Sequence, residues 1–292
     1  MKNDNAFRRE LGKRIRDRRK KLGITQAQLC GDYMTRNMLS RIETGDASPS
    51  LETLLFIAQK LKLPPAFFLC RDAKEEAEYT KTVRIKDAKR MLGTAQYKKC
   101  IDVCQDLPSD DDEVAFMTTV SHILLAVQLL DKGELRDADA QLDHAAKALH
   151  KTVYMYSELQ AQIRLVHLLT ESLAKGTPPD ISAFPDSPPA FFSKDRFLYV
   201  IALSNEVSQY DSISADSIYR THLEGRSLLH SGNPESAMPL LERAVSDAAE
   251  AHMEYFALMD LESAAQAIGD FKTAYTLAKK RIELNSNYNN NN

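Results

Sequence analysis

The chain has 292 residues, of which 43% are hydrophobic and 27% charged, a composition typical of soluble globular proteins. No apolar run approaches the ~18–20 residues that a membrane span needs. The charged N-terminal segment lacks the apolar core of a signal peptide. We therefore expect a cytoplasmic protein with no membrane partner. Four cysteines in this length do not make a disulfide scaffold.

Charge is distributed unevenly along the chain. Residues 1–71 contain 15 Lys and Arg against 7 Asp and Glu, whereas the remaining residues contain 23 against 34. A basic first segment favours a polyanionic partner, which an acidic remainder would repel. Because the chain is also long for a single core, this asymmetry predicts two domains with different tasks.

The first segment begins with two helices that carry recognisable end signals. We expect a helix over residues 7–22, ended by Gly23 as its C-cap. Thr25 then caps a short helix that runs to about Cys30, and Gln28 completes a T-x-x-Q capping box.

Two more capped helices follow a turn at residues 31–34. Thr35 caps a helix over residues 36–44 that ends at Gly45, and Ser50 caps the next helix. The apolar residues expected to form the core are Ile15, Leu22, Ile24, Leu29, Leu39, Ile42, Leu54 and Ile57.

The segment IRDRRKKLGITQAQLCGDYMTRNMLSRIETGDASPSLETLLFIAQKLKLP carries a resemblance, which covers residues 7–69, to the Cro/C1 (XRE-type) helix-turn-helix family. The resemblance implies that the helix over residues 36–44 lies in the major groove of DNA. It also implies a partly buried salt bridge between Arg19 and Glu43. The turn before this helix is one residue shorter than is common in the family, which affects the assignment of individual base contacts. The DNA-binding residues that the resemblance implies are Gln26, Thr35, Arg36, Asn37, Ser40 and Arg41.

These residues have different expected roles. Gln26 matches the family's phosphate-binding glutamine, at a helix N-terminus whose amides add to the contact. Arg36 can donate bidentately to guanine and Asn37 can pair with adenine, each worth ~1–3 kcal/mol of discrimination. Arg41 lies later on the helix, which favours a phosphate over a base.

The remainder of the chain contains an internal repeat. Four segments begin at Ala95, Gly133, Gly232 and Gly269. Five residues after each start comes a small residue, which would let two helices pack closely; these residues are Cys100, Ala138, Ala237 and Ala274. The pattern resembles the tetratricopeptide repeat, whose period is ~34 residues. The alternative interpretation is an irregular helical bundle.

The 99-residue gap between the second and third starts leaves room for two more helices, over residues 154–174 and 194–209. A proline-rich loop at residues 175–189 separates them. The predicted fold is all-α, with a five-helix helix-turn-helix domain at 1–70 and a linker at 71–82. A right-handed superhelix of degenerate tetratricopeptide-like pairs follows at 83–286, and a disordered tail at 287–292.

This combination of domains resembles the peptide-sensing Rgg, PlcR, PrgX and NprR regulators of Gram-positive bacteria. The resemblance implies a homodimer on a palindromic DNA operator, controlled by an oligopeptide in the concave groove of the repeats. Polar or aromatic residues in the expected first helices are the ligand-binding candidates: Lys89, Gln160, Arg164, His167, Tyr199, Asn205, Tyr219, His222 and Arg226. The alternative for each is a solvated surface residue.

Other functional classes receive less support. The sequence has no phosphate-binding glycine loop and no metalloprotease or nucleophile-elbow motif, so we predict neither catalytic residues nor a cofactor. Cys100 and Cys104 lie at i, i+4 in repeat packing positions, which favours core packing over a metal site. Two alternatives stay open: a regulator whose repeats dock a partner protein, and a Rap-like modulator of a signalling protein.

Overall fold

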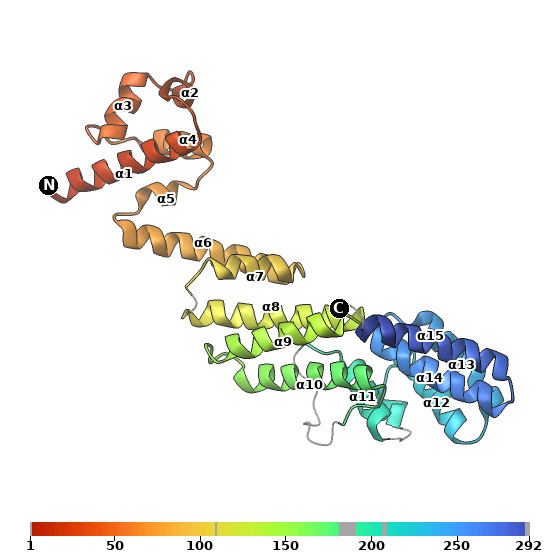
Figure 1. The fold of residues 1–292 in the computed structure, drawn as a ribbon. Coiled ribbons are helices and arrows are strands. Elements are labelled where there is room, and N and C mark those ends of the chain that lie inside the picture. Colours follow the sequence, from red (N-terminus) through yellow and green to blue (C-terminus); the bar gives the residue numbers. More distant parts are fainter. Residues whose placement is uncertain (1, 109, 181–190, 206–208, 290–292) are drawn as a thin grey trace. The chain divides into compact units, whose positions relative to one another are not determined.

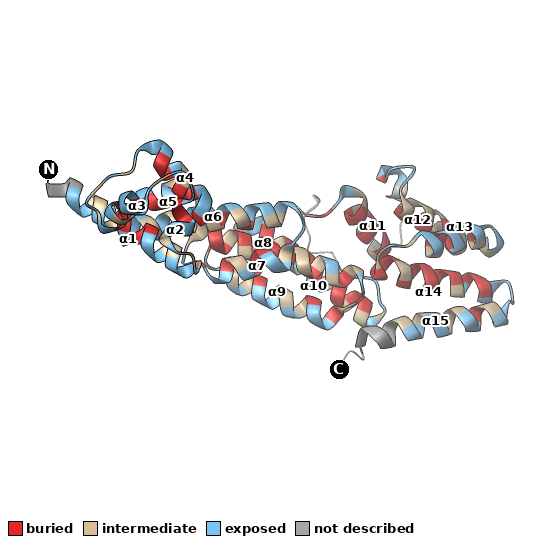
Figure 2. Cartoon of the chain, turned by 90° about the horizontal axis from the view of Figure 1, so that it is seen from above, coloured by how far each residue is buried: buried red, intermediate tan, exposed pale blue. Residues whose placement is uncertain are grey.

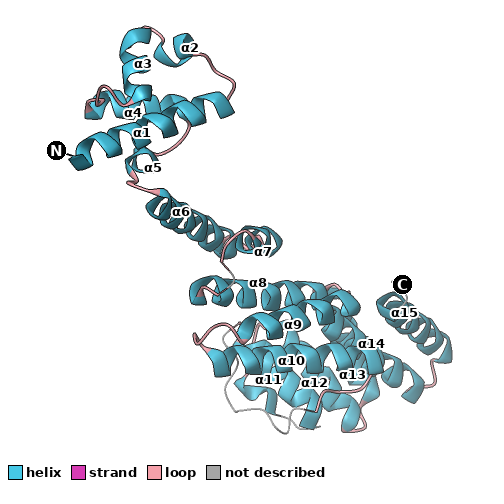
Figure 3. Ribbon diagram, turned by 60° about the vertical axis from the view of Figure 1, so that its left-hand side comes forward, coloured by secondary structure: helices cyan, strands magenta, loops and turns pink. Residues whose placement is uncertain are grey.

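The structure is a computed structural model that describes residues 2–108, 110–180, 191–205 and 209–289 (Figure 1). Across these ranges the regular elements are helices and no strand occurs, as Figure 3 shows. The predicted all-α fold class is therefore confirmed. The chain divides into two compact units, Met1–Lys86 and Asp87–Asn292.

The first unit contains the helices that the end signals predict. Its helices are α1 (Lys2–Lys21), α2 (Gln26–Cys30), α3 (Arg36–Thr44), α4 (Leu51–Leu61), α5 (Pro65–Leu69) and the first part of α6 (Ala73–Gly93). Thr25 and Gln28 form the capping box at α2, and Thr35 and Ser50 accept the capping hydrogen bonds of α3 and α4. The predicted linker at 71–82 lies largely in α6.

A small apolar core holds these helices together. Of the eight predicted core residues, six are buried, and Leu22 and Ile24 pack against them partly exposed. The sequence interpretation did not include five further buried residues: Leu11, Cys30, Ala58, Leu61 and Phe68. In Figure 2 the buried residues lie on the inner sides of the helices.

The second unit is a succession of antiparallel helix pairs. After the end of α6, its helices are α7 (Tyr97–Gln105), α8 (Asp112–Asp131), α9 (Leu135–Leu149), α10 (Tyr156–Lys175), α11 (Lys194–Asn205), α12 (Ile218–His230), α13 (Pro234–Asp247), α14 (Ala251–Ala267) and α15 (Phe271–Asn289). The pairs α8/α9, α12/α13 and α14/α15 pack closely, and α7 and α10 extend the stack along α8 and α9.

The four predicted repeat starts form the same turn. Gly133, Gly232 and Gly269 have φ between 77° and 82°, and Ala95 has φ 56°. In each turn the next residue donates its N–H to a carbonyl five residues back, as Gln96 does to Met91 at 2.9 Å. The small residues five positions after each start are buried. Nine and twelve positions after the last start, the pattern ends with the partly exposed Ala278 and Arg281.

Helix α8 corrects one expectation from the sequence. By length and composition, with a mean hydropathy of 1.6, it is apolar enough to cross a membrane. It packs instead against α7, α9 and α10, and 56% of its most apolar 18-residue stretch is buried. Its hydropathy is that of a core helix.

Parts of three sequence predictions fall outside the described residues. The helix predicted over 194–209 ends at Asn205, and residues 206–208 lie outside. Residues 181–189 of the proline-rich loop and 290–292 of the predicted tail also lie outside, and α15 continues to Asn289.

Candidate functional site

Helix α3 has one face buried in the first unit and another open to solvent. Leu39, Ile42 and Glu43 are buried, whereas Arg36, Asn37 and Arg41 are exposed and Ser40 is partly exposed. Residues 36, 37, 40 and 41 lie within about 140° around the helix, because successive residues are rotated by about 100°. The structure therefore presents the predicted reading residues together.

The start of α3 is held by Thr35, whose hydroxyl oxygen accepts a hydrogen bond from the Met38 N–H at 3.2 Å. This cap fixes where the helix begins and thus where Arg36 and Asn37 project. At the other end, Gly45 adopts φ 82°, and its N–H donates to the carbonyls of Arg41 and Ile42.

A buried ion pair joins α3 to α1, as the sequence implied. The Arg19 guanidinium donates to both carboxylate oxygens of Glu43, at 2.7 and 3.0 Å. This hydrogen bonding raises the pKa of Arg19 against the opposing effect of burial. The amide nitrogen of Gln26 also donates to Glu43, at 2.9 Å. One of the two amide hydrogens of Gln26 is therefore used inside the domain.

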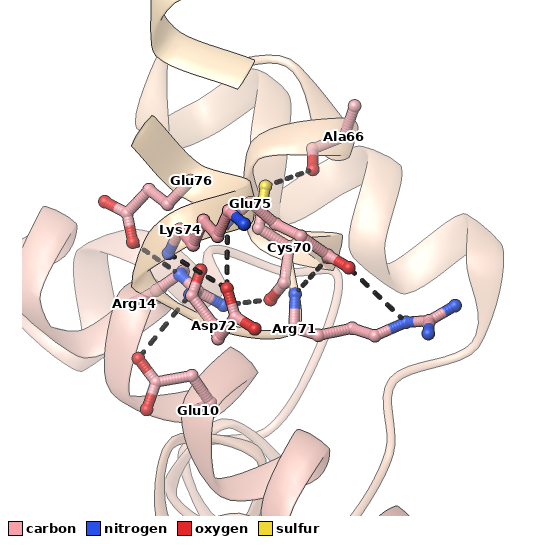
Figure 4. Close-up of polar contacts among 9 residues, drawn as sticks. All are labelled: Glu10, Arg14, Ala66, Cys70, Arg71, Asp72, Lys74, Glu75 and Glu76. Carbon is pink, nitrogen blue, oxygen red and sulfur yellow. Dashed lines mark hydrogen bonds and ion pairs between the residues drawn. The ribbon is translucent and has the colours of Figure 1, made fainter. Parts of the chain in front are cut away.

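Arg14, which sequence reasoning did not single out, binds the beginning of α6 to α1 (Figure 4). It is only 5% exposed, although it is charged. Its guanidinium donates to the carbonyl oxygens of Cys70 and Asp72, and to a carboxylate oxygen of Glu76 at 2.9 Å. Four described groups with negative or partial negative charge surround it, including Glu10 at 3.6 Å. The basic domain is thus anchored to the helix that leaves it.

In the second unit, four of the nine ligand-binding candidates come together in a buried polar network. The Tyr199 hydroxyl lies 2.9 Å from Nδ1 of His222. The Asp260 carboxylate accepts from Nε2 of His222 at 3.0 Å and from Arg226 at 2.8 and 2.9 Å. Burial alone would raise the pKa of Asp260, but the hydrogen bond from His222 and the charge of Arg226 hold it below its ordinary value.

The fourth candidate, Tyr219, belongs to a second group of polar contacts, which meets the first where the Tyr199 and Tyr219 ring centroids lie 4.9 Å apart. Its hydroxyl donates to Glu250 at 2.5 Å, and Glu250 also pairs with Arg196 at 3.1 Å. Arg196 reaches Asp131 of α8 at 2.6 Å. Burial raises the pKa of Glu250 and of Tyr219, and burial also raises the pKa of Tyr199. The polar groups of these side chains thus form hydrogen bonds or ion pairs within the second unit.

The other five candidates are separated from this network. Lys89 is exposed and pairs with Glu113 at 2.5 Å. Gln160, Arg164 and His167 are exposed along α10, where His167 lies 3.2 Å from Asp139. The side chain of Asn205 lies outside the described residues.

Sequence reasoning missed the acidic partners Asp131, Glu250 and Asp260 and the basic Arg196. Asp131, Asp260 and Arg196 lie on different helices from the groups they bind, and Glu250 lies just before α14, at separations of up to 65 residues. No local sequence pattern reports such pairings. Cys100 and Cys104 are buried, and Sγ of Cys100 donates to the Ala88 carbonyl at 3.3 Å, in the packing positions that the repeat predicts.

Comparison with known proteins identifies the first unit. The helix-turn-helix family model matches residues 15–68. No curated protein sequence matches the chain. The match to the helix-turn-helix family model includes α2, α3 and the caps described above. It agrees with a DNA-binding rather than an enzymatic role.

Several solved structures align along most of the chain at low identity. Bacillus thuringiensis PlcR, in complex with the peptide PapR7 and DNA, is 15% identical with a TM-score of 0.24, covering 94% of this chain and 95% of that one. Apo ComR from Streptococcus vestibularis is 18% identical with a TM-score of 0.22, covering 92% and 99%. The Streptococcus dysgalactiae SHP pheromone receptor Rgg2 is 15% identical with a TM-score of 0.20, covering 94% and 99%.

The family assignment rests on residues 15–68, where the matched sequence, the caps and the position of α3 agree. The first unit of this chain carries a helix-turn-helix DNA-binding domain.

Proposed function

We propose that the chain is a transcription regulator that reads a DNA operator through α3. The observation that carries this proposal is the exposed polar face of α3 inside a matched helix-turn-helix segment. Arg36 and Asn37 contact base edges, because they stand at the solvent-facing start of the helix. Ser40 and Thr35 lie beside them, while Arg41 and Gln26 contact phosphates. A regulator of this kind acts in the cytoplasm.

The operator is proposed to be palindromic and bound by a homodimer. One α3 reads a short half-site, and two copies related by two-fold symmetry read two half-sites about one helical turn apart. The excess of basic over acidic residues in the first unit supplies the sequence-independent part of the affinity.

The test selects operators from a random pool of DNA duplexes with the full chain and compares variants on the selected site. Arg36→Ala/Asn37→Ala should lose ~2–5 kcal/mol of discrimination while keeping the salt-dependent nonspecific binding. Arg90→Ala is a control, because it removes one exposed positive charge from the second unit. A double variant that still prefers the selected site would refute the assignment of α3.

The effector is proposed to be an oligopeptide bound by the repeats. Support comes from the resemblance of the sequence to peptide-sensing regulators. Gln160, Arg164 and His167 are the accessible candidates, because they are exposed on one helix. Tyr199, Tyr219, His222 and Arg226 would reach a peptide only if their buried bonds opened.

Thermal unfolding of the full chain with short peptides from adjacent open reading frames tests this part. A peptide at 100 times its dissociation constant should stabilise the chain by ~2.7 kcal/mol. No shift with any peptide, together with a co-purifying protein, would instead favour a repeat domain that docks a partner.

A further inference from the structure

A cavity of about 260 Å³ opens among α7, α8 and α9 of the second unit. Four basic side chains, and no acidic one, occur among its described lining residues: His122, His144, Lys147 and Lys151. Apolar groups, including Leu107 and Val114, complete the wall. The cavity therefore combines positive charge with an apolar surface, although the second unit as a whole is acidic.

Each of the two histidines has one ring nitrogen bonded within the second unit. His122 is only 9% exposed, and its Nδ1 lies 2.8 Å from Oε1 of Gln141. His144 stacks on it with ring centroids 5.2 Å apart, and its Nδ1 donates to the Ala140 carbonyl at 2.6 Å. Among the described residues, Nε2 of neither ring has a hydrogen-bond partner. Each Nε2 is therefore available to a ligand in the cavity.

The two lysines are also uncompensated. Lys147 lies in the last turn of α9 and Lys151 lies two residues after its end, and neither forms an ion pair with a described residue. Lys89, Lys175 and Lys280 elsewhere in this unit each pair with a glutamate. Positive charge is thus left free at the mouth of a cavity that contains unpartnered imidazole nitrogens.

We propose that this cavity binds a small organic anion, with a carboxylate or phosphate head between the lysines and histidines and a short apolar body against Leu107 and Val114. The ammonium groups donate charge-assisted hydrogen bonds to the head. A proton taken up at Nε2 of His122 or His144 supplies another donor. The apolar wall excludes water from one side of these contacts.

None of the nine candidates for peptide binding lines this cavity. Its wall comes from α7 and α9, which are second helices of their pairs, and from the first helix α8 through Val114, Thr118 and His122. The inference therefore does not depend on the peptide effector, and it gives the second unit an additional small-molecule input.

Proton uptake distinguishes this site from loose attraction to surface lysines. Burial lowers the pKa of His122. The other titratable groups that line the cavity with it are His144 and Lys147 from α9, Lys151 from the turn after α9, and Cys104 from α7. An anion bound next to His122 favours the protonated ring, so that binding should take up protons at neutral pH.

The test is titration calorimetry of the full chain with hexanoate, inorganic phosphate and the uncharged hexanol, in two buffers of different ionisation enthalpy. We expect at least one anion to bind with a dissociation constant of about 1 mM or lower, with proton uptake. Hexanol should bind at least about tenfold more weakly than the anion that binds. Hexanoate binding assigns the head as a carboxylate, and phosphate binding assigns it as a phosphate.

Lys147→Ala/Lys151→Ala should weaken anion binding at least about tenfold. The matched control is Lys98→Ala/Lys99→Ala, which removes two exposed lysines of α7 that do not line the cavity. Circular dichroism checks that both double variants keep the helical fold. Binding of neither anion below about 10 mM, equal weakening by both double variants, or equal binding of hexanol would each overturn the proposal.

Discussion

Arg19 and Glu43 join α1 to α3 through two hydrogen bonds of 2.7 and 3.0 Å. Because the Glu43 side chain is only 3% exposed, it depends on Arg19 for most of its charge compensation. The position of α3 thus depends on an ion pair on its buried side, away from its exposed face. Arg14 has a comparable role at the other end of the unit, where it holds the start of α6.

Arg19→Met should loosen α3, because it leaves the Glu43 carboxylate buried without its main partner. The expected cost is about 3 kcal/mol, the usual scale for breaking one side of a buried pair. Hydrogen exchange measured on peptides from α1 and α3 checks this. The double variant Arg19→Met/Glu43→Leu should recover most of the protection, since no charge is then stranded. Additive losses in the double variant would show that the two residues are not coupled.

Gly12 lies where α1 crosses α3, and a methyl group there has no space. A Cβ on Gly12 would be 2.2 Å from the carbonyl oxygen of Ile42. Alanine favours helix over glycine by up to ~1 kcal/mol. Moving two packed backbones apart costs ~1–3 kcal/mol. At a distance of 2.2 Å we expect this cost to exceed the gain in helix propensity. Gly12→Ala should therefore lower the melting temperature of the first unit, as measured by calorimetry.

Gly93 provides the matched comparison for Gly12. It is the last residue of α6, and no heavy atom lies within 4 Å of a Cβ built there. Because a Cβ at this position meets no clash, only the higher helix propensity of alanine should act, and Gly93→Ala should stabilise the chain by ~0.5–1 kcal/mol. If both substitutions change stability in the same direction, the close approach of α1 and α3 is not the cause.

The sequence allowed the helix ends to be predicted because their signals are local. Thr25, Thr35 and Ser50 each cap a helix by accepting a hydrogen bond from the backbone N–H three residues further on. The repeat was recognisable for a similar reason, since each turn places a small residue at a fixed distance from its start. The pair Arg19–Glu43 came from a family resemblance and lies beyond the reach of periodicity.

The buried network was out of reach for a different reason. His222, Arg226 and Tyr219 were selected as polar residues of expected first helices, and as such they suggested a surface. Their acidic partners Asp260 and Glu250 lie on or just before α14, so that the network forms only when α11, α12 and α14 pack together. Hydropathy would also place Arg14 at the surface, because a charged side chain is expected there unless its partners are known. In the structure Arg14 is buried.

Ala95 occupies a turn position where the three equivalent residues are glycines. Its φ of 56° lies in the left-handed region, which costs a residue with a Cβ ~1–2 kcal/mol. Glycine removes this cost, but it also raises the conformational entropy of the unfolded chain, which offsets part of the gain. Ala95→Gly should therefore stabilise the second unit by ~0.5–1 kcal/mol in urea unfolding.

The reverse substitution at an equivalent turn checks this assignment. Gly232 has φ 79°, and a Cβ built there meets nothing within 4 Å. Gly232→Ala should destabilise the chain by about 1 kcal/mol through backbone conformation alone. Stabilisation by Gly232→Ala would contradict the shared turn geometry.

His252 gives the second unit a stability that depends on pH. Ser172 donates its hydroxyl hydrogen to the Thr177 carbonyl at 2.6 Å, so Nε2 of His252 donates to the Ser172 oxygen at 3.3 Å. Burial, with smaller contributions from the charges of Arg196 and His222, lowers the pKa of His252 to about 3. The unfolded chain binds a proton below about pH 6.5, whereas the folded chain leaves this ring neutral. The resulting stability is fully present above pH 6.5 and is lost as the pH falls toward 3.

Between pH 7.0 and 5.5 this linkage should cost the folded chain about 1 kcal/mol, as measured by urea unfolding at both pH values. His252→Gln keeps a donor for Ser172 but does not titrate, so the difference between the two pH values should shrink by about that amount. His122, whose pKa is also lowered by burial, contributes with the same sign but is present in both proteins, and the comparison cancels it. If the change in unfolding free energy between the two pH values is the same in His252→Gln, the His252 ring is protonated in the folded chain. That would contradict the prediction, because it places a cation at a site that is 3% exposed and near the charge of Arg196.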